Sequence, residues 1–251
     1  MSSNSSWQPA NRADPRARIT RFRHPKWPEP AMPSEAGAGQ TATMTTTTFG
    51  RRSFARWYPR FMDRVERAGQ ADIRRDQLAH ARGRTLEIGA GSGLSVPHYP
   101  DQLEELVLLE PNPDLRAQLA ARTDTPDVPV RVIDGDAHAL DFPDAAFDTV
   151  TASLVFCSLR DPVRALAEVH RVLRPGGVFL FHEHVRGSGV RAVFQDALTP
   201  LQRRLADGCH ANRDFESLVR AGKFATVELT AMRMPTRLPT IVPLVVGSAR
   251  K

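Results

Sequence analysis

The residues with the clearest chemical meaning form a glycine-rich loop after a short apolar segment. The segment Thr85–Ile88 contains Glu87 and runs directly into Gly89, Gly91 and Gly93. Glycine permits the positive φ values of a tight strand-to-helix turn, and the missing Cβ lets a ligand lie against the backbone. A dinucleotide-binding loop places its third glycine one residue later, where the pyrophosphate meets a helix N-terminus. The spacing here, with an acid two residues before the first glycine, favours a cationic ligand that lacks a pyrophosphate.

Two further segments have residue types that bind a nucleoside. Glu110, followed by Pro111, comes 21 residues after Gly89 at the end of a second apolar segment. A carboxylate at that place in a doubly wound fold accepts hydrogen bonds from both ribose hydroxyls. Asp136 and Ala137 follow a third apolar segment. We expect the Asp136 carboxylate to accept the adenine amine and the Ala137 N–H to donate to a ring nitrogen.

Three titratable residues stand together at the end of a later apolar segment. His182, Glu183 and His184 are consecutive, and the side chains of successive strand residues point to opposite faces of a sheet. We therefore expect the two histidines on one face and Glu183 on the other. One of the three, His184 first, is a candidate general base or positioning group for a nucleophile. The alternative is that Glu183 caps a neighbouring helix and both histidines fill polar core positions.

The two cysteines, Cys157 and Cys209, are 52 residues apart and have no clustered metal-ligating residues beside them in the sequence. We therefore expect no metal site, and we expect Cys157 to pack as a small apolar residue. Two cysteines in a chain of this length do not make a disulfide framework, so a reduced, cytoplasmic protein is expected.

The segments that must position these residues alternate between strand and helix patterns from Gly83 onward. The expected strands are Thr85–Ile88, Glu105–Glu110, Val130–Ile133, Phe147–Ala152, Val178–His184, Thr226–Thr230 and Val242–Ala249. The expected helices are Asp114–Ala121, Pro162–Leu173, Ala192–Leu205 and Arg213–Ala221, with Arg174-Pro175-Gly176-Gly177 as a stop and a turn. This order predicts an α/β fold, a doubly wound parallel sheet with helices on both faces.

The N-terminal third of the chain has a different character. Residues 1–48 are rich in Pro, Ser, Ala, Gly and Thr without periodicity, which predicts a disordered tail. Residues 49–80 include apolar positions at helical spacing from Phe54 to Val65 and are expected to form a covering helix. Pro59 predicts that the regular helix begins near it, because proline is tolerated in a first turn. Residues 81–251 form the expected catalytic domain.

The net charge of +6 is concentrated in one part of the chain. Residues 1–80 hold 14 Lys and Arg against 7 Asp and Glu, whereas residues 81–251 hold 20 against 21. A basic nucleic-acid groove across the domain is therefore not expected. The sequence contains no run of about eighteen apolar residues, so no membrane-spanning helix is expected. Peripheral contact with a membrane stays open, and the oligomeric state is not indicated.

Taken in order, these segments resemble the class I S-adenosylmethionine-dependent methyltransferases. The motifs are the glycine loop, Glu110, Asp134-Gly135-Asp136-Ala137, Asp144–Asp148 and Leu173–Gly177. The branch that includes ubiquinone and menaquinone C-methyltransferases is similar over about residues 54–251. The resemblance implies a Rossmann-like seven-stranded sheet whose last strand is antiparallel. It also implies S-adenosylmethionine as the cofactor, laid across the carboxyl ends of the first strands.

A narrower likeness points to the acceptor. Ser153–Ser158, His182–Val185 and Asp207-Gly208-Cys209 are similar to a membrane-associated group of methyltransferase-like proteins that methylate alkyl thiols, whose bacterial relatives are often described as phospholipid methyltransferases. The resemblance implies methyl transfer to a small or amphipathic acceptor, with a thiol favoured. The alternatives are a phospholipid amine, a quinone-type ring carbon, or a cofactor-binding protein without catalysis. A nicotinamide-dependent dehydrogenase is disfavoured by the glycine spacing.

Three residues outside the main motifs complete the expected cofactor site. Tyr58 is a candidate to close over the methionine end of the cofactor, where its ring would attract the sulfonium. The alternative is that Tyr58 is an ordinary core residue. Val155 and Phe156, after the fourth strand, are expected to line the side between adenine and acceptor.

Overall fold

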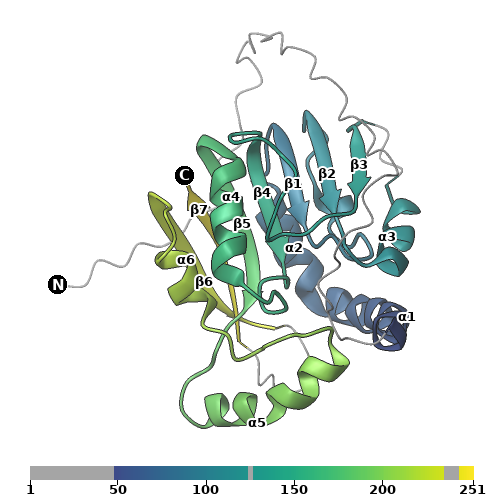
Figure 1. Cartoon of the computed structure of the whole chain (residues 1–251), viewed down its shortest axis with the longest axis vertical. Helices are drawn as coiled ribbons and strands as arrows, with labels where there is room; N and C mark the ends of the chain where they lie inside the picture. The colour runs from purple at the N-terminus through teal and green to yellow at the C-terminus, as the bar shows by residue number, and fades with distance from the viewer. Residues whose placement is uncertain (1–47, 124–126, 235–242) are drawn as a thin grey trace, which may run out of the picture. The chain divides into compact units, whose positions relative to one another are not determined.

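The fold is built on one sheet whose strands alternate with helices along the chain. The computed structural model describes residues 48–123, 127–234 and 243–251 (Figure 1). The strands are β1 (Arg84–Ile88), β2 (Glu105–Leu109), β3 (Val130–Ile133), β4 (Phe147–Ser153), β5 (Leu173–His184), β6 (Thr226–Arg233) and β7 (Pro243–Arg250). The α-helices are α1 (Thr48–Val65), α2 (Ala71–Leu78), α3 (Pro113–Ala120), α4 (Pro162–Val172), α5 (Val190–Leu205) and α6 (Phe215–Arg220).

The strand order in the sheet is β3-β2-β1-β4-β5-β7-β6. Strands β1 to β5 pair in parallel, and β7 runs antiparallel to both of its neighbours, β5 and β6. The expected seven-stranded sheet with an antiparallel last strand is therefore confirmed. The chain reverses its winding direction between β1 and β4, so ligands bind at the carboxyl ends of these strands.

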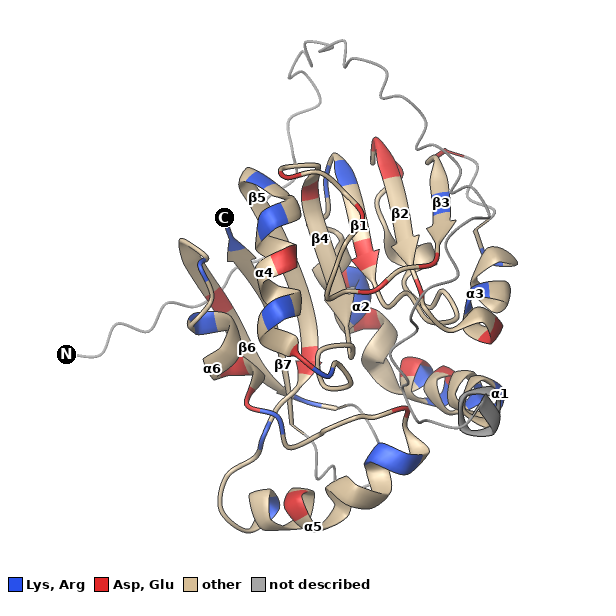
Figure 2. Cartoon of the chain, viewed as in Figure 1, with Lys and Arg blue, Asp and Glu red and all other residues tan. Residues whose placement is uncertain are grey.

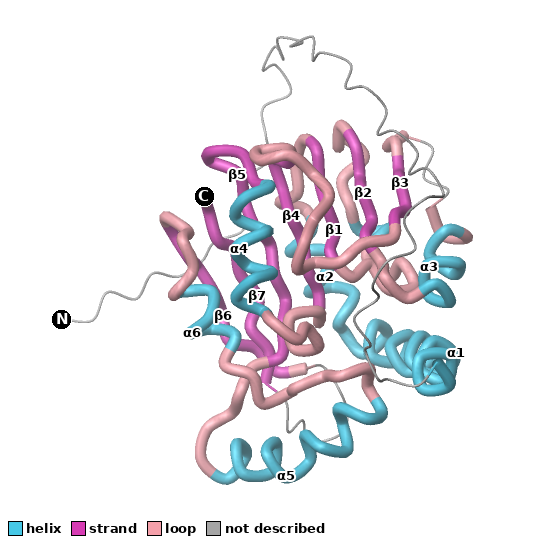
Figure 3. The backbone as a smooth tube through the Cα atoms, in the orientation of Figure 1, coloured by secondary structure: helices cyan, strands magenta, loops and turns pink. Residues whose placement is uncertain are grey.

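Helices cover both faces of the sheet, as the tube in Figure 3 also shows. Leu86 and Ile88 of β1 lie in a buried cluster with residues of α4 and α6. Leu106 and Leu108 of β2 lie in a second cluster with Leu78 of α2. Strand side chains alternate between the two faces, and β2 supplies both apolar layers, because Val107 and Leu109 lie in the first cluster. The near-continuous apolar run of β2 is explained by this double burial, whereas β1 turns the buried polar residues Thr85 and Glu87 to its second face.

The N-terminal helix differs from the sequence expectation at Pro59. Helix α1 begins at Thr48 and contains Pro59 in its interior, so the expectation that the regular helix begins near Pro59 is wrong. Proline cannot donate to the carbonyl four residues earlier, here that of Ala55. The side-chain amide of Gln118 in α3 donates to that carbonyl at 3.0 Å. A neighbouring helix therefore satisfies the group that Pro59 leaves free.

A π-helical turn, η1 (Glu66–Gln70), joins α1 to α2. Gly69 within it has a φ of 121°, which bends the chain between the two helices. The expected tail, residues 1–48, lies outside the described residues except for Thr48. Val242, the first residue expected in the last strand, also lies outside them.

The segment Arg174–Gly177 also differs from the expectation of a simple stop and turn. It lies within β5, between the pairs Phe147–Leu173 and Thr149–Val178 of the β4–β5 ladder. The β5 chain has the longer stretch between these two pairs, so the segment bulges from the sheet. The helix α4 does end before it, at Val172.

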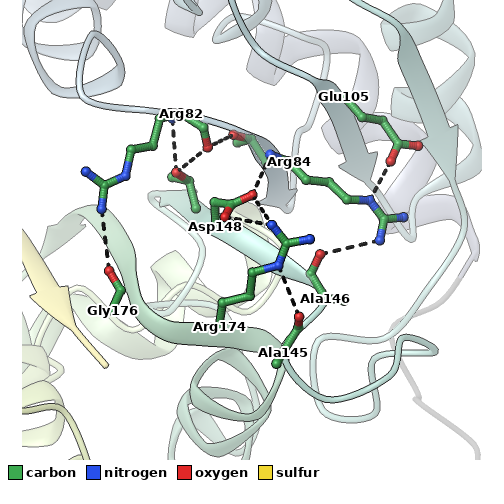
Figure 4. A network of polar contacts seen from close by, with 10 residues as sticks. Arg82, Arg84, Glu105, Ala145, Ala146, Asp148, Arg174 and Gly176 are labelled. Atoms are coloured by element: carbon green, nitrogen blue, oxygen red, sulfur yellow. Dashed lines mark hydrogen bonds and ion pairs between the residues drawn. The ribbon is translucent and has the colours of Figure 1, made fainter. Parts of the chain in front are cut away.

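A polar network holds this bulge at the amino ends of β1 and β4 (Figure 4). The Asp148 carboxylate accepts the Arg84 backbone N–H at 2.9 Å, and Nη1 of Arg174 lies 2.8 and 2.7 Å from its two oxygens. Arg82 donates to the Gly176 carbonyl at 3.4 Å. This edge is opposite to the carboxyl ends of the parallel strands, so the network stabilises the sheet and does not face a ligand.

Candidate active site

The glycine loop leaves β1 at the carboxyl edge and is tied to the end of β2. Gly89 and Ala90 donate their N–H groups to the Leu109 carbonyl at 2.8 and 3.0 Å. The φ of Gly89 is +66°, and a Cβ built on it would lie 2.6 Å from Cγ2 of Val155. Gly93 also has a positive φ, and a Cβ there would lie 2.9 Å from Leu119. Packing therefore requires glycine at both ends of the loop.

Gly91, in the middle of the loop, has a different surrounding. Its φ is +58°, and a Cβ built on it meets no heavy atom within 4 Å. The loop therefore presents bare backbone to open space at this residue, as a site for a closely approaching ligand would. The Gly91 N–H donates to Oε2 of Glu110 at 2.8 Å, which links the two predicted cofactor residues directly.

Glu110 stands at the end of β2 and is 5% exposed. Its second oxygen, Oε1, accepts the backbone N–H of Asn112 at 2.8 Å. Asn112 in turn caps the N-terminus of α3, so the carboxylate is rigidly held. Burial raises the pKa of Glu110, and the two backbone N–H groups oppose that rise. The adjacent Pro111 is exposed beside it.

Glu87 is buried on β1, and its Oε2 atom has no hydrogen-bond partner among the described residues. Burial raises the pKa of Glu87, while Ser95, Arg74 and Tyr99 nearby lower it. A buried carboxylate oxygen without a donor is costly. An ammonium group on a bound ligand would remove that cost, so this site fits the cationic methionine end of S-adenosylmethionine.

Asp136 and Ala137 follow β3 on the same edge of the sheet. The Asp136 side chain is exposed and accepts both the N–H and Nδ1 of His138, at 2.9 and 2.5 Å. Burial of Asp136 raises its pKa, but the bonds from His138 outweigh this and lower it. The carboxylate is therefore ionised and can accept a further donor. Ala137 is buried against the core, which fixes the backbone of this turn.

The turn after β4 carries Val155 and Phe156, whose side chains point to different surroundings. Val155 packs directly on Gly89 of the glycine loop. Phe156 is fully buried and packs on Phe179 and Phe215, with ring centroids 5.6 and 5.2 Å away. The Val155 side chain thus borders the loop, whereas the Phe156 side chain belongs to the core.

The three residues at the end of β5 have three different surroundings. Glu183 is fully buried, and its carboxylate accepts the N–H groups of Val155, Phe156 and Cys157 at 2.8, 3.0 and 3.4 Å. Burial raises the pKa of Glu183 to about 7, against the effect of these donors. The three bonds anchor the turn after β4, so Glu183 has a structural contact, but to a turn and not to the helix end considered as the alternative.

His182 is also fully buried, and Nε2 lies 2.6 Å from the side-chain amide of Gln70 in η1. Burial lowers the pKa of His182 well below its usual value, so the ring is neutral. His184 is half-buried at the end of the strand, where the sulfur of Cys209 lies 3.8 Å from its Nδ1. Of the three candidates, His184 alone combines partial exposure with reactive neighbours.

The cysteines form a cluster with His184, which corrects the expectation that they have no neighbouring ligand residues. The two sulfurs of Cys157 and Cys209 are 3.5 Å apart. One ligand atom from each of Cys157, His184 and Cys209 lies within 4.8 Å of the others. The sequence separation hid this cluster because the sheet brings the turn after β4, the end of β5 and the segment after α5 to one place.

Tyr58 of α1 lies beside this cluster. It is half-buried and stacks on Phe54 with ring centroids 4.4 Å apart. Burial raises the pKa of Tyr58, and the neighbouring Cys157 and Cys209 raise it further. The hydroxyl is therefore protonated, and the N-terminal helix contributes a side chain to the carboxyl edge of the sheet.

Arg74 of α2 is a site residue that the sequence did not reveal. It is 4% exposed, pairs with Glu66 at 2.9 Å, and donates to Ser95 at 2.8 Å. It thus supplies positive charge behind Glu87. In the sequence Arg74 is one of many arginines in the basic N-terminal third, so nothing marked it as buried.

Comparisons with known proteins agree with this geometry. A family profile described as a methyltransferase domain matches residues 86–181. The chain is 30% identical over 171 residues to a thiol S-methyltransferase, TMT1B, of Rattus norvegicus, covering 66% of this chain and 70% of the relative. It is 31% identical over 189 residues to a phosphatidylethanolamine N-methyltransferase of Cereibacter sphaeroides, covering 72% and 90%.

A solved structure confirms the fold. A protein of Thermotoga maritima described as a SAM-dependent methyltransferase and possible histamine N-methyltransferase aligns with a TM-score of 0.60. The alignment covers 80% of this chain and 99% of that one at 21% identity. On the sequence matches to methyltransferases and on this fold, the chain belongs to the S-adenosylmethionine-dependent methyltransferases.

Proposed function

We propose that this enzyme transfers the methyl group of S-adenosylmethionine to the thiol of a small or amphipathic acceptor. The observation that carries the proposal is the position of His184, Cys157 and Cys209. They lie at the same carboxyl edge as the glycine loop, beside Tyr58. This surrounding is sulfur-rich, and the carboxylate of the neighbouring Glu183 is occupied by the N–H groups of the turn after β4.

The proposed contacts assign the cofactor to the residues of the first three strands. S-adenosylmethionine supplies a methyl group that is already activated by its sulfonium centre. Glu110 would accept the ribose hydroxyls, Glu87 would face the ammonium group, and Gly91 would give the ligand room. Asp136 and Ala137 would bind the adenine. These groups orient the methyl group, and orientation is the main contribution that such a displacement needs.

The acceptor must lose its proton, and His184 is the proposed group beside it. A thiol with a pKa near ~8.5 is partly ionised at neutral pH, so modest help is sufficient. His184 can position the sulfur or take its proton. His182 and Glu183 have their contacts inside the protein, to Gln70 and to the turn after β4. We assign these two a positioning role for the strand end.

A second candidate, methylation of a phospholipid amine, is favoured by helix α5. Its buried positions include the polar Gln195 and Thr199, while large apolar side chains point outward. The exposed residues of this apolar face of α5 are Val190, Val193, Phe194, Leu198, Leu201 and Leu205. Such a face suits an interface with lipid, where an amphipathic acceptor is held. No helix in the described part of the chain is long and apolar enough to cross a membrane.

The test is a methyl-transfer assay with radiolabelled cofactor and three acceptors: an alkyl thiol, phosphatidylethanolamine vesicles and a quinol. The alcohol of the same chain length as the thiol is the matched control. We expect turnover of the thiol and no turnover of the alcohol. Turnover of the phospholipid alone would replace the thiol with the second candidate, and turnover of the quinol alone would favour a ring carbon.

Cofactor binding is tested separately by calorimetric titration with S-adenosylhomocysteine. We expect Glu110→Gln to weaken binding about 10- to 100-fold, as for the loss of hydrogen bonds to a charged group. The control Glu228→Gln removes an exposed carboxylate of β6 and should leave the affinity unchanged. Equal affinity of Glu110→Gln and the wild type would contradict the assigned ribose contact.

A further inference from the structure

The cluster of Cys157, His184 and Cys209 has the composition and spacing of a metal site. The sulfurs are 3.5 Å apart, and the sulfur of Cys209 is 3.8 Å from Nδ1 of His184. In tetrahedral zinc sites, bonds of about 2.3 Å to sulfur and about 2.0–2.1 Å to nitrogen place two sulfurs roughly 3.8 Å apart and a sulfur and a nitrogen roughly 3.6 Å apart. These two separations are within a few tenths of an ångström of those values, and the ligand atoms of Cys157 and His184 lie within 4.8 Å of each other.

Each ligand residue is fixed by its own segment. The turn that carries Cys157 is anchored by the Glu183 carboxylate. The Cys157 carbonyl accepts the N–H of His210 at 2.8 Å, which ties this turn to the segment of Cys209. The Cys209 N–H donates to the Ala206 carbonyl at 2.9 Å after α5. A ligand set held in this way before binding is what a metal site requires.

The burial of the cluster is uneven. Cys157 and Cys209 are 2% and 5% exposed, whereas His184 is half-buried. Two thiolates and a neutral imidazole balance a divalent charge, and two cysteines with one histidine and an open fourth position form one of the known catalytic zinc sets. We propose that Cys157, His184 and Cys209 bind one divalent d¹⁰ metal ion, with zinc expected, and leave one coordination position for the acceptor sulfur.

The role of this ion rests on the proposed thiol methyltransferase function. Binding of the acceptor thiol to the ion would release its S–H proton to solvent, so in this arrangement His184 positions the acceptor as a metal ligand and does not take the proton. The acceptor sulfur then forms a bond to the methyl carbon as the bond from that carbon to the sulfonium sulfur breaks. The products are a thioether and S-adenosylhomocysteine, and the ion returns to a water ligand. A soft thiolate is a preferred ligand of such an ion, and a neutral thioether is a weak one, which favours release.

A disulfide between the cysteines is the competing arrangement. It requires the sulfurs to approach from 3.5 Å to about 2.05 Å. Disulfide formation also needs an oxidant, and it does not explain why the His184 ring lies beside the two sulfurs. The metal site accounts for all three side chains at their present spacing.

The first measurement is the metal content of the full-length protein, purified without chelator and in the presence of a thiol reductant. Mass spectrometry of the metal should find about one zinc per chain. Cys157→Ser and Cys209→Ser should each lose most of it. The control His80→Ala removes an exposed histidine after α2 that is not part of the cluster, and it should keep the zinc. Calorimetry with S-adenosylhomocysteine shows whether each variant is folded.

The second measurement replaces zinc with Co²⁺ and records the visible spectrum. We expect intense tetrahedral d–d bands and a sulfur-to-cobalt charge-transfer band, both absent in Cys157→Ser. Addition of the acceptor thiol should shift the charge-transfer band. A wild-type protein that binds S-adenosylhomocysteine but takes up neither Zn²⁺ nor Co²⁺ would overturn the proposal, as would a mass lower by two hydrogens that marks a disulfide. A metal-bound spectrum that no thiol changes would overturn the acceptor role.

These outcomes separate the metal site from the proposed function. Thiol methylation by a protein without metal uptake would retain the function and remove the site. Metal uptake without turnover of any thiol would retain the site and remove the thiol acceptor.

Discussion

At the scale of single residues, the candidate site contains two buried carboxylates, and neither of them forms a salt bridge with a described residue. Glu87 and Glu110 lie at the ends of neighbouring parallel strands and have pKa values raised by burial. Their ionisation costs more in the ligand-free protein than in water, and a bound cationic, hydroxyl-bearing ligand would offset that cost. The free energy of cofactor binding is therefore coupled to the protonation of these groups.

This coupling predicts a pH dependence with a defined sign. A carboxyl whose folded pKa is raised stabilises the ligand-free protein below its ordinary pKa, near 4.5, and loses that contribution as the pH rises through the folded pKa. The ligand requires the ionised form. The rise in Tm caused by S-adenosylhomocysteine should therefore grow as the pH is raised above 4.5, as measured by thermal unfolding from pH 5 upward with and without ligand.

The control for this prediction is the double variant Glu87→Gln, Glu110→Gln, whose side chains do not titrate. Its ligand-induced rise in Tm should be small and nearly flat with pH. A wild-type response as flat as that of the double variant would show that the carboxyls are already ionised at pH 5.

Gly91 offers a second prediction, with Gly176 as a matched control. Both have positive φ values, +58° and +76°, and a Cβ on either meets no atom within 4 Å. Alanine at either position should therefore cost a similar strain of about 1 kcal/mol in the free energy of unfolding. Only Gly91→Ala should weaken S-adenosylhomocysteine binding, by about tenfold or more, because its Cβ enters the ligand space. Equal binding by both variants would place the ligand away from the loop.

At the scale of elements, α1 depends on a contact with α3. Gln118 donates to the Ala55 carbonyl that Pro59 leaves without a partner. Gln118→Leu should lower the free energy of unfolding by about 1 kcal/mol, the usual loss for one hydrogen bond. In the Pro59→Ala background the helix supplies its own N–H, so the loss should be smaller. Denaturant unfolding of the four proteins in this double-mutant cycle measures the difference, and equal losses would contradict the coupling.

The apolar face of α5 predicts binding to a lipid surface. The last turn of α5 also carries two exposed arginines, Arg203 and Arg204, and Figure 2 marks the charged segments of the helix. Phe194→Ser with Leu198→Ser should lower co-sedimentation with anionic vesicles about tenfold or more, because burial of each large side chain contributes roughly 1.5–3 kcal/mol.

The matched control for this experiment is Val163→Ser on α4. Val163 is also an exposed apolar residue, 62% accessible, but it is isolated from the face of α5. It should leave vesicle binding unchanged. Vesicle binding that survives the α5 double change would assign the apolar face to another partner.

At the scale of the whole molecule, the parts of the fold that repeat a pattern could be predicted from the sequence. Strand and helix segments followed from apolar periodicity and from caps such as Asp161, and the glycine loop marked the ligand edge. The interior position of Pro59 could not be predicted, because the compensating donor is more than fifty residues away. The cluster of Cys157, His184 and Cys209 was missed for the same reason: it exists only after the sheet has formed.

The placement of β7 has a consequence for the order in which the protein is made. Strand β7 is inserted between β5 and β6, both of which leave the ribosome earlier, and Leu244 pairs with His184 at the site. Until Pro243–Arg250 is synthesised, β5 and β6 have open edges that can pair with other nascent chains. The half with the glycine loop can assemble first, whereas the half with the proposed acceptor site is completed only by β7. A cofactor or chaperone that binds during synthesis would therefore bind a chain in which the glycine loop is folded and β5 and β6 are still unpaired at one edge.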